Sequence, residues 1–146
     1  MIVRPVEKAD WQEWLRMRRL LWPSTSPTEH EDEMSAYFMR GEDFLSWVAE
    51  KSDKQLIGFL EASIRQFAED GDTQNAGYIG GWYVEPDFRR TGVGRLLVSH
   101  AAQWARAQGC KAMGSDCELG NEISLKAHRG VGFEEASPSF YFRKRL

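Results

Sequence analysis

The chain has 146 residues, of which 42% are hydrophobic and 28% charged, and its formal net charge is −3. This composition is typical of one globular domain, residues 1–146, and the acidic balance argues against the basic face with which proteins hold nucleic acid. The sequence contains no apolar run long enough to span a membrane, no apolar leader after Met1 and two cysteines without metal-ligand spacing. We therefore expect a cytoplasmic protein with no metal site and no membrane partner.

Hydrophobic periodicity and turn residues predict an α/β fold, a mixed sheet flanked by helices. The loop 24–27 separates the first two helices, and 52–54 reads as a tight turn. In chain order we expect a strand over residues 1–6, a helix over 10–22, a helix beginning at 28, strands over 44–50 and 55–67, a hairpin loop over 69–77, a strand over 78–84, a helix over 92–108, a strand over 111–116, a helix over 122–129 and two strands from 133 onward.

Two capping boxes mark the starts of the first two helices. Asp10 is followed three residues later by Glu13, and Thr28 in the same way by Glu31. In this arrangement the first side chain accepts a hydrogen bond from a backbone N–H group of the first turn. We therefore expect Asp10 and Thr28 to be the cap residues.

A glycine-rich turn joins the strand 78–84 to the helix 92–108. The first N–H groups of a helix have no partner within it and carry the positive end of the helix dipole. Gly92 and Gly94 would let the backbone approach an anion closely, and the arginines at 89, 90 and 95 would add positive charge. The pattern is neither a complete Walker A loop nor the full GxGxxG fingerprint. Taken alone, it fits either a phosphate site or a tight turn with solvated arginines.

The segment from Val84 to Gly94 resembles the acetyl-CoA signature of the GNAT acetyltransferase family. Downstream, Asn121, His128 and the run 132–134 are similar to that family's last helix and the strand after it. The likeness in element order covers essentially the whole chain. It implies the GNAT acyl-CoA N-acyltransferase fold, with acetyl-CoA lying where the two parallel strands 78–84 and 111–116 splay apart.

The resemblance also implies roles for individual residues. The Val84 N–H would polarise the acetyl carbonyl. His128, which stands where many members of the family have a tyrosine, would protonate the departing thiolate, although a purely structural histidine fits the sequence too. The cofactor-binding residues that it implies are Trp82, Tyr83, Val84, Arg89, Arg90, Thr91, Gly92, Val93, Gly94, Arg95 and Asn121.

Further blocks of sequence are similar to the aminoglycoside 6′-N-acetyltransferases within that family. They are the stretches 18–23, 60–65, 115–116, 132–135 and 140–145. The resemblance implies acetyl transfer to the 6′-amino group of an aminoglycoside antibiotic, which confers resistance, by a protein that forms a homodimer. Asp116 would bind the reacting ammonium group and accept its proton, and Trp22 and Phe67 would line the substrate site.

The sequence leaves several alternatives open. Asp116 could instead cap the following loop, and Trp22 could belong to the core. Gly80 and Ser137 stand where the resemblance leads one to expect substrate-site glutamates. The substrate could then be another cationic amine, such as a polyamine, an amino sugar or a protein N-terminus, or the protein could be an acyl-CoA-binding sensor without turnover. The acidic stretch 29–33 is either a solvated helix face or a rim that attracts cations.

Overall fold

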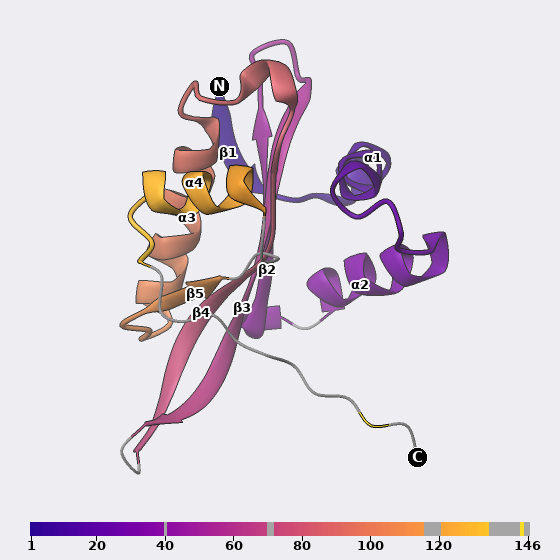
Figure 1. The fold of residues 1–146 in the computed structure, drawn as a ribbon. Coiled ribbons are helices and arrows are strands. Elements are labelled where there is room, and N and C mark those ends of the chain that lie inside the picture. Colours follow the sequence, from indigo (N-terminus) through magenta and orange to yellow (C-terminus); the bar gives the residue numbers. More distant parts are fainter. Residues whose placement is uncertain (40, 70–71, 116–120, 135–143, 145–146) are drawn as a thin grey trace. The chain divides into compact units, whose positions relative to one another are not determined.

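The computed structural model describes residues 1–39, 41–69, 72–115, 121–134 and 144 (Figure 1). These residues belong to two compact units, Met1–Ser115 and Asp116–Leu146. The first unit contains the sheet and most of the helices, and the second contains one helix. Among the described residues, no helix combines the length and the apolar character that crossing a bilayer requires.

The order of the elements follows the sequence prediction as far as the last helix. Three short 3₁₀ turns, at Lys8–Asp10, Gly41–Asp43 and Pro86–Phe88, were not anticipated. The helices and strands are β1 (Ile2–Pro5), α1 (Trp11–Leu21), α2 (Pro27–Met39), β2 (Phe44–Glu50), β3 (Leu56–Glu69), β4 (Asp72–Val84), α3 (Val93–Ala107), β5 (Met113–Ser115) and α4 (Glu122–Gly130).

The strands form one mixed sheet in the order β1-β2-β3-β4-β5, which confirms the predicted fold class. Strands β1 to β4 pair with one another in antiparallel fashion, whereas β5 pairs with β4 in parallel fashion. Within the first unit, α1 and α2 cover one face of the sheet and α3 covers the other (Figure 1). Both faces of the central strands are therefore buried, which explains the largely apolar sequence of β2 and of the first half of β3.

The main core lies between the sheet and the pair α1 and α2. Its buried side chains are Trp14, Met17, Met34, Val48, Leu56, Phe59 and Tyr83. On the opposite face, Leu97 and Ala101 of α3 are fully buried, and the Trp104 ring meets that of Trp47 edge-on at 5.5 Å. Burial of each large side chain contributes about 1.5–3 kcal/mol, so these two layers hold the strands that carry the candidate site.

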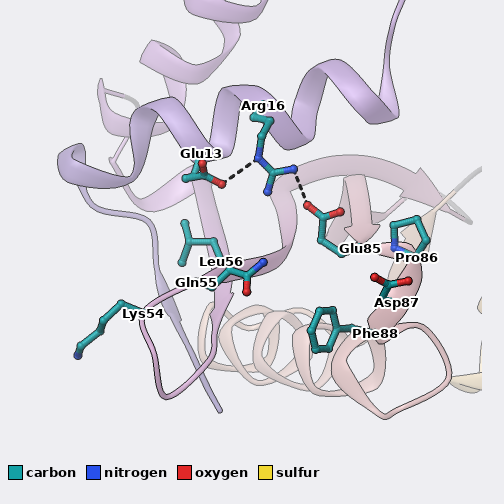
Figure 2. Close-up of a pocket in the computed structure, with 9 residues that line it drawn as sticks. All are labelled: Glu13, Arg16, Lys54, Gln55, Leu56, Glu85, Pro86, Asp87 and Phe88. Atoms are coloured by element: carbon teal, nitrogen blue, oxygen red, sulfur yellow. Dashed lines mark hydrogen bonds and ion pairs between the residues drawn. The ribbon is translucent and has the colours of Figure 1, made fainter.

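Arg16 links α1 to the residue that follows β4. Its guanidinium group lies 2.6 Å from a Glu85 carboxylate oxygen and 2.9 Å from one of Glu13 (Figure 2). Glu85 immediately precedes Pro86, where the 3₁₀ turn leading to α3 begins. The ion pair therefore ties the glycine-rich turn to the α1 side of the sheet.

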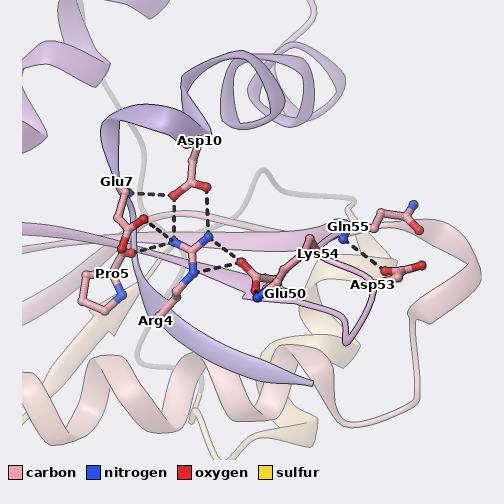
Figure 3. Close-up of polar contacts among 8 residues, drawn as sticks. All are labelled: Arg4, Pro5, Glu7, Asp10, Glu50, Asp53, Lys54 and Gln55. Atoms are coloured by element: carbon pink, nitrogen blue, oxygen red, sulfur yellow. Dashed lines mark hydrogen bonds and ion pairs between the residues drawn. The ribbon is translucent and has the colours of Figure 1, made fainter.

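The predicted caps are wrong in detail. Asp10 does occupy the N-cap position of α1, but its side chain makes no capping bond to the helix; its carboxylate instead accepts a hydrogen bond of 2.7 Å from the Glu7 N–H and two bonds from Arg4 (Figure 3). The helix α2 begins at Pro27 rather than Thr28, and the Ser26 hydroxyl accepts the Glu29 N–H at 3.2 Å. Proline at the first helical position, after a serine cap, is a more favourable start because its missing N–H would have had no partner there.

The loop predicted over residues 69–77 is also wrong, because β4 begins at Asp72 and pairs with β3 from there. Polar residues sustain this pairing, since backbone hydrogen bonds between antiparallel strands do not require apolar side chains. The predicted strands from residue 133 onward lie largely outside the described residues.

Candidate functional site

The glycine-rich turn adopts backbone conformations that expose its N–H groups. Arg90 has φ 64° and Gly92 has φ 93°, both in the left-handed region, which is costly for a residue with a side chain such as Arg90. Gly92 caps α3, whose first backbone hydrogen bond runs from the Leu96 N–H to the Gly92 carbonyl at 3.0 Å. Within the described residues, the N–H groups of 90–94 have no backbone acceptor. They lie at the positive end of the α3 dipole, an arrangement suited to a phosphate.

Two neighbours hold this turn in place. A Cβ atom at Gly94 would lie 3.1 Å from the Trp82 ring, so only glycine lets α3 begin this close to β4. The Arg89 guanidinium donates through Nε to the Val84 carbonyl at 2.8 Å and lies over the Tyr83 ring at 5.7 Å. Arg89 therefore secures the end of β4 as well as adding positive charge.

A β-bulge opens the sheet beside this turn. Glu61 pairs with Gly81 and Ala62 with Ile79, so Gly80 is an extra residue on β4. Pairing of β4 with β5 covers only residues 77–79 of β4. The pairing with β5 thus ends where the bulge begins, and we call residues 81–84 the open edge of β4.

Alternation along β4 sets which backbone groups face that open edge. Glu85 donates its N–H to the Ile57 carbonyl at 2.8 Å, and hydrogen-bonded pairs recur at every second residue of an antiparallel ladder. Tyr83, opposite Phe59, therefore directs its N–H and carbonyl toward β3. Trp82 and Val84 direct theirs toward the open edge, where the Val84 carbonyl is bonded by Arg89.

A pocket of about 420 Å³ lies on the α2 side of the sheet and reaches the bulge. The Trp22 ring, half-buried, forms part of its wall and also packs onto β4, since a Cβ at Gly81 would lie 2.5 Å from the ring. Trp22 thus serves the pocket and the core together. The lining residues are Trp22, Thr25, Glu33, Ala36, Tyr37, Phe44, Glu61, Arg65 and Gly80.

A buried ion cluster forms the floor of this pocket. The Arg18 guanidinium, 1% exposed, lies 3.0 and 3.1 Å from the two carboxylate oxygens of Glu61. Its second terminal nitrogen bonds Glu33, and its Nε lies 3.3 Å from Nδ1 of His30. Its carbon centre also lies 4.8 Å from the centroid of the Trp22 ring, a cation–π contact.

Burial sets the protonation of this cluster. It raises the pKa of Glu61 to about 7, against the opposing effects of Arg18 and of the Trp14 indole, which donates to the carboxylate at 2.9 Å. Burial also raises the pKa of the Tyr37 hydroxyl, which stays protonated as a donor. Desolvation disfavours the charged form of any acid, so the carboxylate gains its full charge only above neutral pH.

A second hollow of about 560 Å³ is lined by residues of α1, the β2–β3 turn and the segment after β4 (Figure 2). Its acidic side chains include Glu13 and Glu85, both bonded to Arg16. The lining of this hollow includes neither the bulge nor the residues of the open edge of β4. We therefore take the pocket beside the bulge as the candidate amine site.

In the second unit, Asn121 and His128 both have local partners. Asn121 caps α4 by accepting the Ser124 N–H at 3.1 Å. The His128 Nδ1 lies 2.7 Å from the Ser124 carbonyl, which can only accept, so Nδ1 carries a proton and Nε2 is the atom that can exchange one. The His128 ring also meets Phe133 edge-on at 5.5 Å.

Some residues predicted for the site cannot be placed. Asp116 and Ser137 lie outside the described residues, as does the side chain of Phe67, whose backbone belongs to β3.

Arg18 and Glu61 were not predicted as site residues, although the sequence contains one signal for them. A glutamate in the apolar run 56–62 cannot face solvent if the strand is buried on both sides. Such a residue must have a buried partner, and Arg18 is that partner. The acidic stretch 29–33 was interpreted either as a solvated helix face or as a rim that attracts cations. Within this stretch, Glu33 is the residue that lines the pocket, so the structure supports a rim at that residue only.

Comparison with known proteins agrees with this geometry. The profile of the Acetyltransferase (GNAT) family matches residues 11–133, a range that includes the glycine-rich turn, the bulge and the pocket. The chain belongs to the GNAT acetyltransferase family. Within it, the chain is similar over its full length to aminoglycoside N(6')-acetyltransferases.

Two curated relatives are named aminoglycoside N(6')-acetyltransferase type 1. The one from Klebsiella aerogenes is 42% identical, over 99% of this chain and 97% of its own length. The one from Acinetobacter haemolyticus is 36% identical, over 100% and 99%.

Solved structures give the same result. The aminoglycoside antibiotic 6'-N-acetyltransferase AAC(6')-IG from Acinetobacter haemolyticus superposes with a TM-score of 0.90 at 37% identity, covering 100% of this chain and 99% of its own. The enzyme AAC(6')-Iy, in complex with the bisubstrate analogue CoA-S-monomethyl-acetylneamine, superposes with a TM-score of 0.89 at 32% identity, covering 99% and 98%.

Proposed function

We propose that this protein transfers the acetyl group of acetyl-CoA to the 6′-amino group of aminoglycoside antibiotics. The observation that carries this proposal is the likeness, over 99% of the chain, to a protein named for that reaction. The pocket chemistry agrees, because Glu33 and the Trp22 ring offer a carboxylate and a flat apolar surface to a cationic sugar.

The glycine-rich turn fits the phosphate groups of acetyl-CoA. Arg90 and Gly92 hold the turn in its left-handed shape, and a Cβ at Gly94 would press on the Trp82 ring. The N–H groups of residues 90–95 would hold the pyrophosphate, assisted by the arginine side chains at 89, 90 and 95. When bound, acetyl-CoA supplies the reactive thioester. Trp82 and Val84 would align its pantetheine arm along the open edge of β4, and Asn121 would also bind the cofactor.

The Val84 N–H, which faces the open edge, would donate to the acetyl oxygen. Asp116, which follows the last residue of β5, would bind the 6′-ammonium group and accept its proton. His128 would hold a proton on Nε2 for the leaving sulfur, its tautomer fixed by the Ser124 carbonyl. Trp22 and Phe67 would contact the sugar rings.

Three further assignments belong to this proposal. Residues 1–146 act as one acetyltransferase domain, because the family match from 11 to 133 includes parts of both units. The enzyme works in the cytoplasm, where acetyl-CoA is made. It forms a homodimer, which light scattering coupled to gel filtration would test.

The experiment is thiol release from acetyl-CoA by the purified protein, with kanamycin A as the amine. Kanamycin A has a 6′-amino group, so we expect amine-dependent release with a KM in the micromolar range. The matched control is a kanamycin analogue with hydroxyl in place of the 6′-amine, which should give none. Release that is equal with both compounds would contradict the assignment of the 6′ position. Release only with spermidine or another amine would show that the substrate is not an aminoglycoside.

A further inference from the structure

We propose that Glu33 binds a second ammonium group of the substrate, one that does not react, and that Arg18 positions it for this role. The inference rests on the proposed function and adds a specificity-determining residue to the same pocket. It follows from the charges and burial of the ion cluster on the pocket floor.

The cluster has more negative than positive charge above neutral pH. Arg18 is one guanidinium facing two carboxylates, those of Glu33 and Glu61. Glu61 is 3% exposed and is saturated by Arg18 and by the Trp14 indole. The negative charge that Arg18 does not neutralise is therefore assigned to Glu33. Its side chain is 54% exposed and lines the pocket.

Arg18 fixes where that charge lies. Its fork is bonded to Glu61 on one nitrogen and to Glu33 on the other, and the Trp22 ring packs against it. Because Arg18 is itself buried, it cannot follow Glu33 into solvent. Glu33 is thus held over the pocket by one carboxylate oxygen, Oε2, while Oε1 has no hydrogen-bond partner among the described residues. A carboxylate held in this way loses little conformational entropy when it binds a cation.

In the lining of the pocket, Glu33 comes from a different element than the bulge. It belongs to α2, whereas Gly80 belongs to β4, whose open edge carries the proposed acetyl-transfer groups. An amine bound at Glu33 is therefore distinct from the amine at the open edge. A cation of the lining, Arg65, lies 3.5 Å from the centroid of the Tyr78 ring, which holds it on the β3–β4 side. A substrate with several ammonium groups would bind both places at once.

The test compares Glu33→Gln with Glu31→Gln at pH 8. Both residues lie on α2 and both variants remove one negative charge, but Glu31 is exposed and does not line the pocket. We expect Glu33→Gln to raise the KM for kanamycin A about tenfold, with kcat within about twofold, and Glu31→Gln to change neither. Glu33→Asp, which keeps the charge, should recover part of the loss.

A monoamine separates the second site from the reacting one. For 6-amino-6-deoxyglucose, which has one amine, Glu33→Gln should leave the KM unchanged. An equal rise for both compounds, or equal values for the variants at positions 33 and 31, would overturn the inference. Calorimetry measures the binding of kanamycin A to the same variants without acetyl-CoA and so needs no turnover. A failure of the proposed reaction can therefore be told apart from a failure of the Glu33 inference. The salt dependence of that binding should weaken in Glu33→Gln alone.

Discussion

Glu61 illustrates how a single residue links the core to the site. It lies in the middle of β3, where its neighbours Leu60 and Ala62 are fully buried, and it stabilises Arg18 while forming part of the pocket floor. A buried ion pair of this kind adds little net stability, but removal of one partner leaves an uncompensated charge. The pair therefore fixes the position of α1 relative to β3.

The first prediction at this scale concerns pH. Since burial raises the pKa of Glu61 from its usual value to about 7, the folded state holds its proton over a range in which the unfolded state has lost it. Its contribution to the free energy of unfolding is complete below about pH 4.5 and is lost as pH rises to about 7, a change of roughly 3 kcal/mol.

Urea unfolding of the wild type and Glu61→Gln between pH 4.5 and 8 measures this contribution. The stability of the wild type relative to the variant should fall across that window, because glutamine cannot titrate. A constant difference between the two would mean that Glu61 ionises in the folded state as it does in the unfolded chain.

At the scale of elements, Arg4 connects β1 to the segment before α1 and to the end of β2. It belongs to β1, bonds both carboxylate oxygens of Asp10 before α1, and contacts Glu50 at the end of β2 at 2.6 Å (Figure 3). Burial opposes the ionised form of Asp10, but the bonds from Arg4 and from the Glu7 N–H lower its pKa. The hydrogen bond from Arg4 likewise lowers the pKa of Glu50.

We expect Arg4→Met to lower the melting temperature by about 5–10 °C, because two largely buried carboxylates lose their common partner. Lys54→Met is the matched control, since Lys54 also pairs with Glu50, at 3.6 Å, but is 84% exposed. It should change the melting temperature by less than about 2 °C.

Acid provides a second readout for Arg4. The pKa values of Asp10 and Glu50 are lowered in the folded state, so their contribution is present above about pH 4 and is lost as pH falls further. The melting temperatures of wild type and Arg4→Met should therefore converge in acid. Curves that stay parallel down to pH 3 would show that Arg4 acts through packing alone.

The elements that the sequence predicted well are those whose signal is local. The strand β2 was predicted to the residue and α3 to within one residue at each end, because an apolar run and flanking glycines mark them. The glycine-rich turn was found for the same reason. The start of β4 was missed because it depends on pairing with β3. The ion pair of Arg18 with Glu61 was missed because its two residues lie 43 positions apart in the sequence.

At the scale of the whole molecule, the residues proposed to bind acetyl-CoA belong to two separate stretches of the chain. The turn 90–95 and the open edge of β4 belong to the first unit, whereas Asn121 and His128 belong to the second. A phosphate turn alone can bind a nucleotide-like anion, but acetyl transfer as proposed also requires the proton donor on α4. If the proposed assignments are right, both stretches should respond to acetyl-CoA.

Hydrogen exchange measures that response directly. We expect acetyl-CoA at saturating concentration to slow amide exchange at least tenfold both in residues 90–96 and in α4, because a ligand stabilises the residues that bind it against local opening. The control is Gly94→Val, whose added side chain would meet the Trp82 ring and block the turn, so that acetyl-CoA protects neither region. Protection confined to residues 90–96 in the wild type would restrict the cofactor site to the first unit. It would then remove Asn121 and His128 from the site and leave the leaving-group proton without its assigned donor.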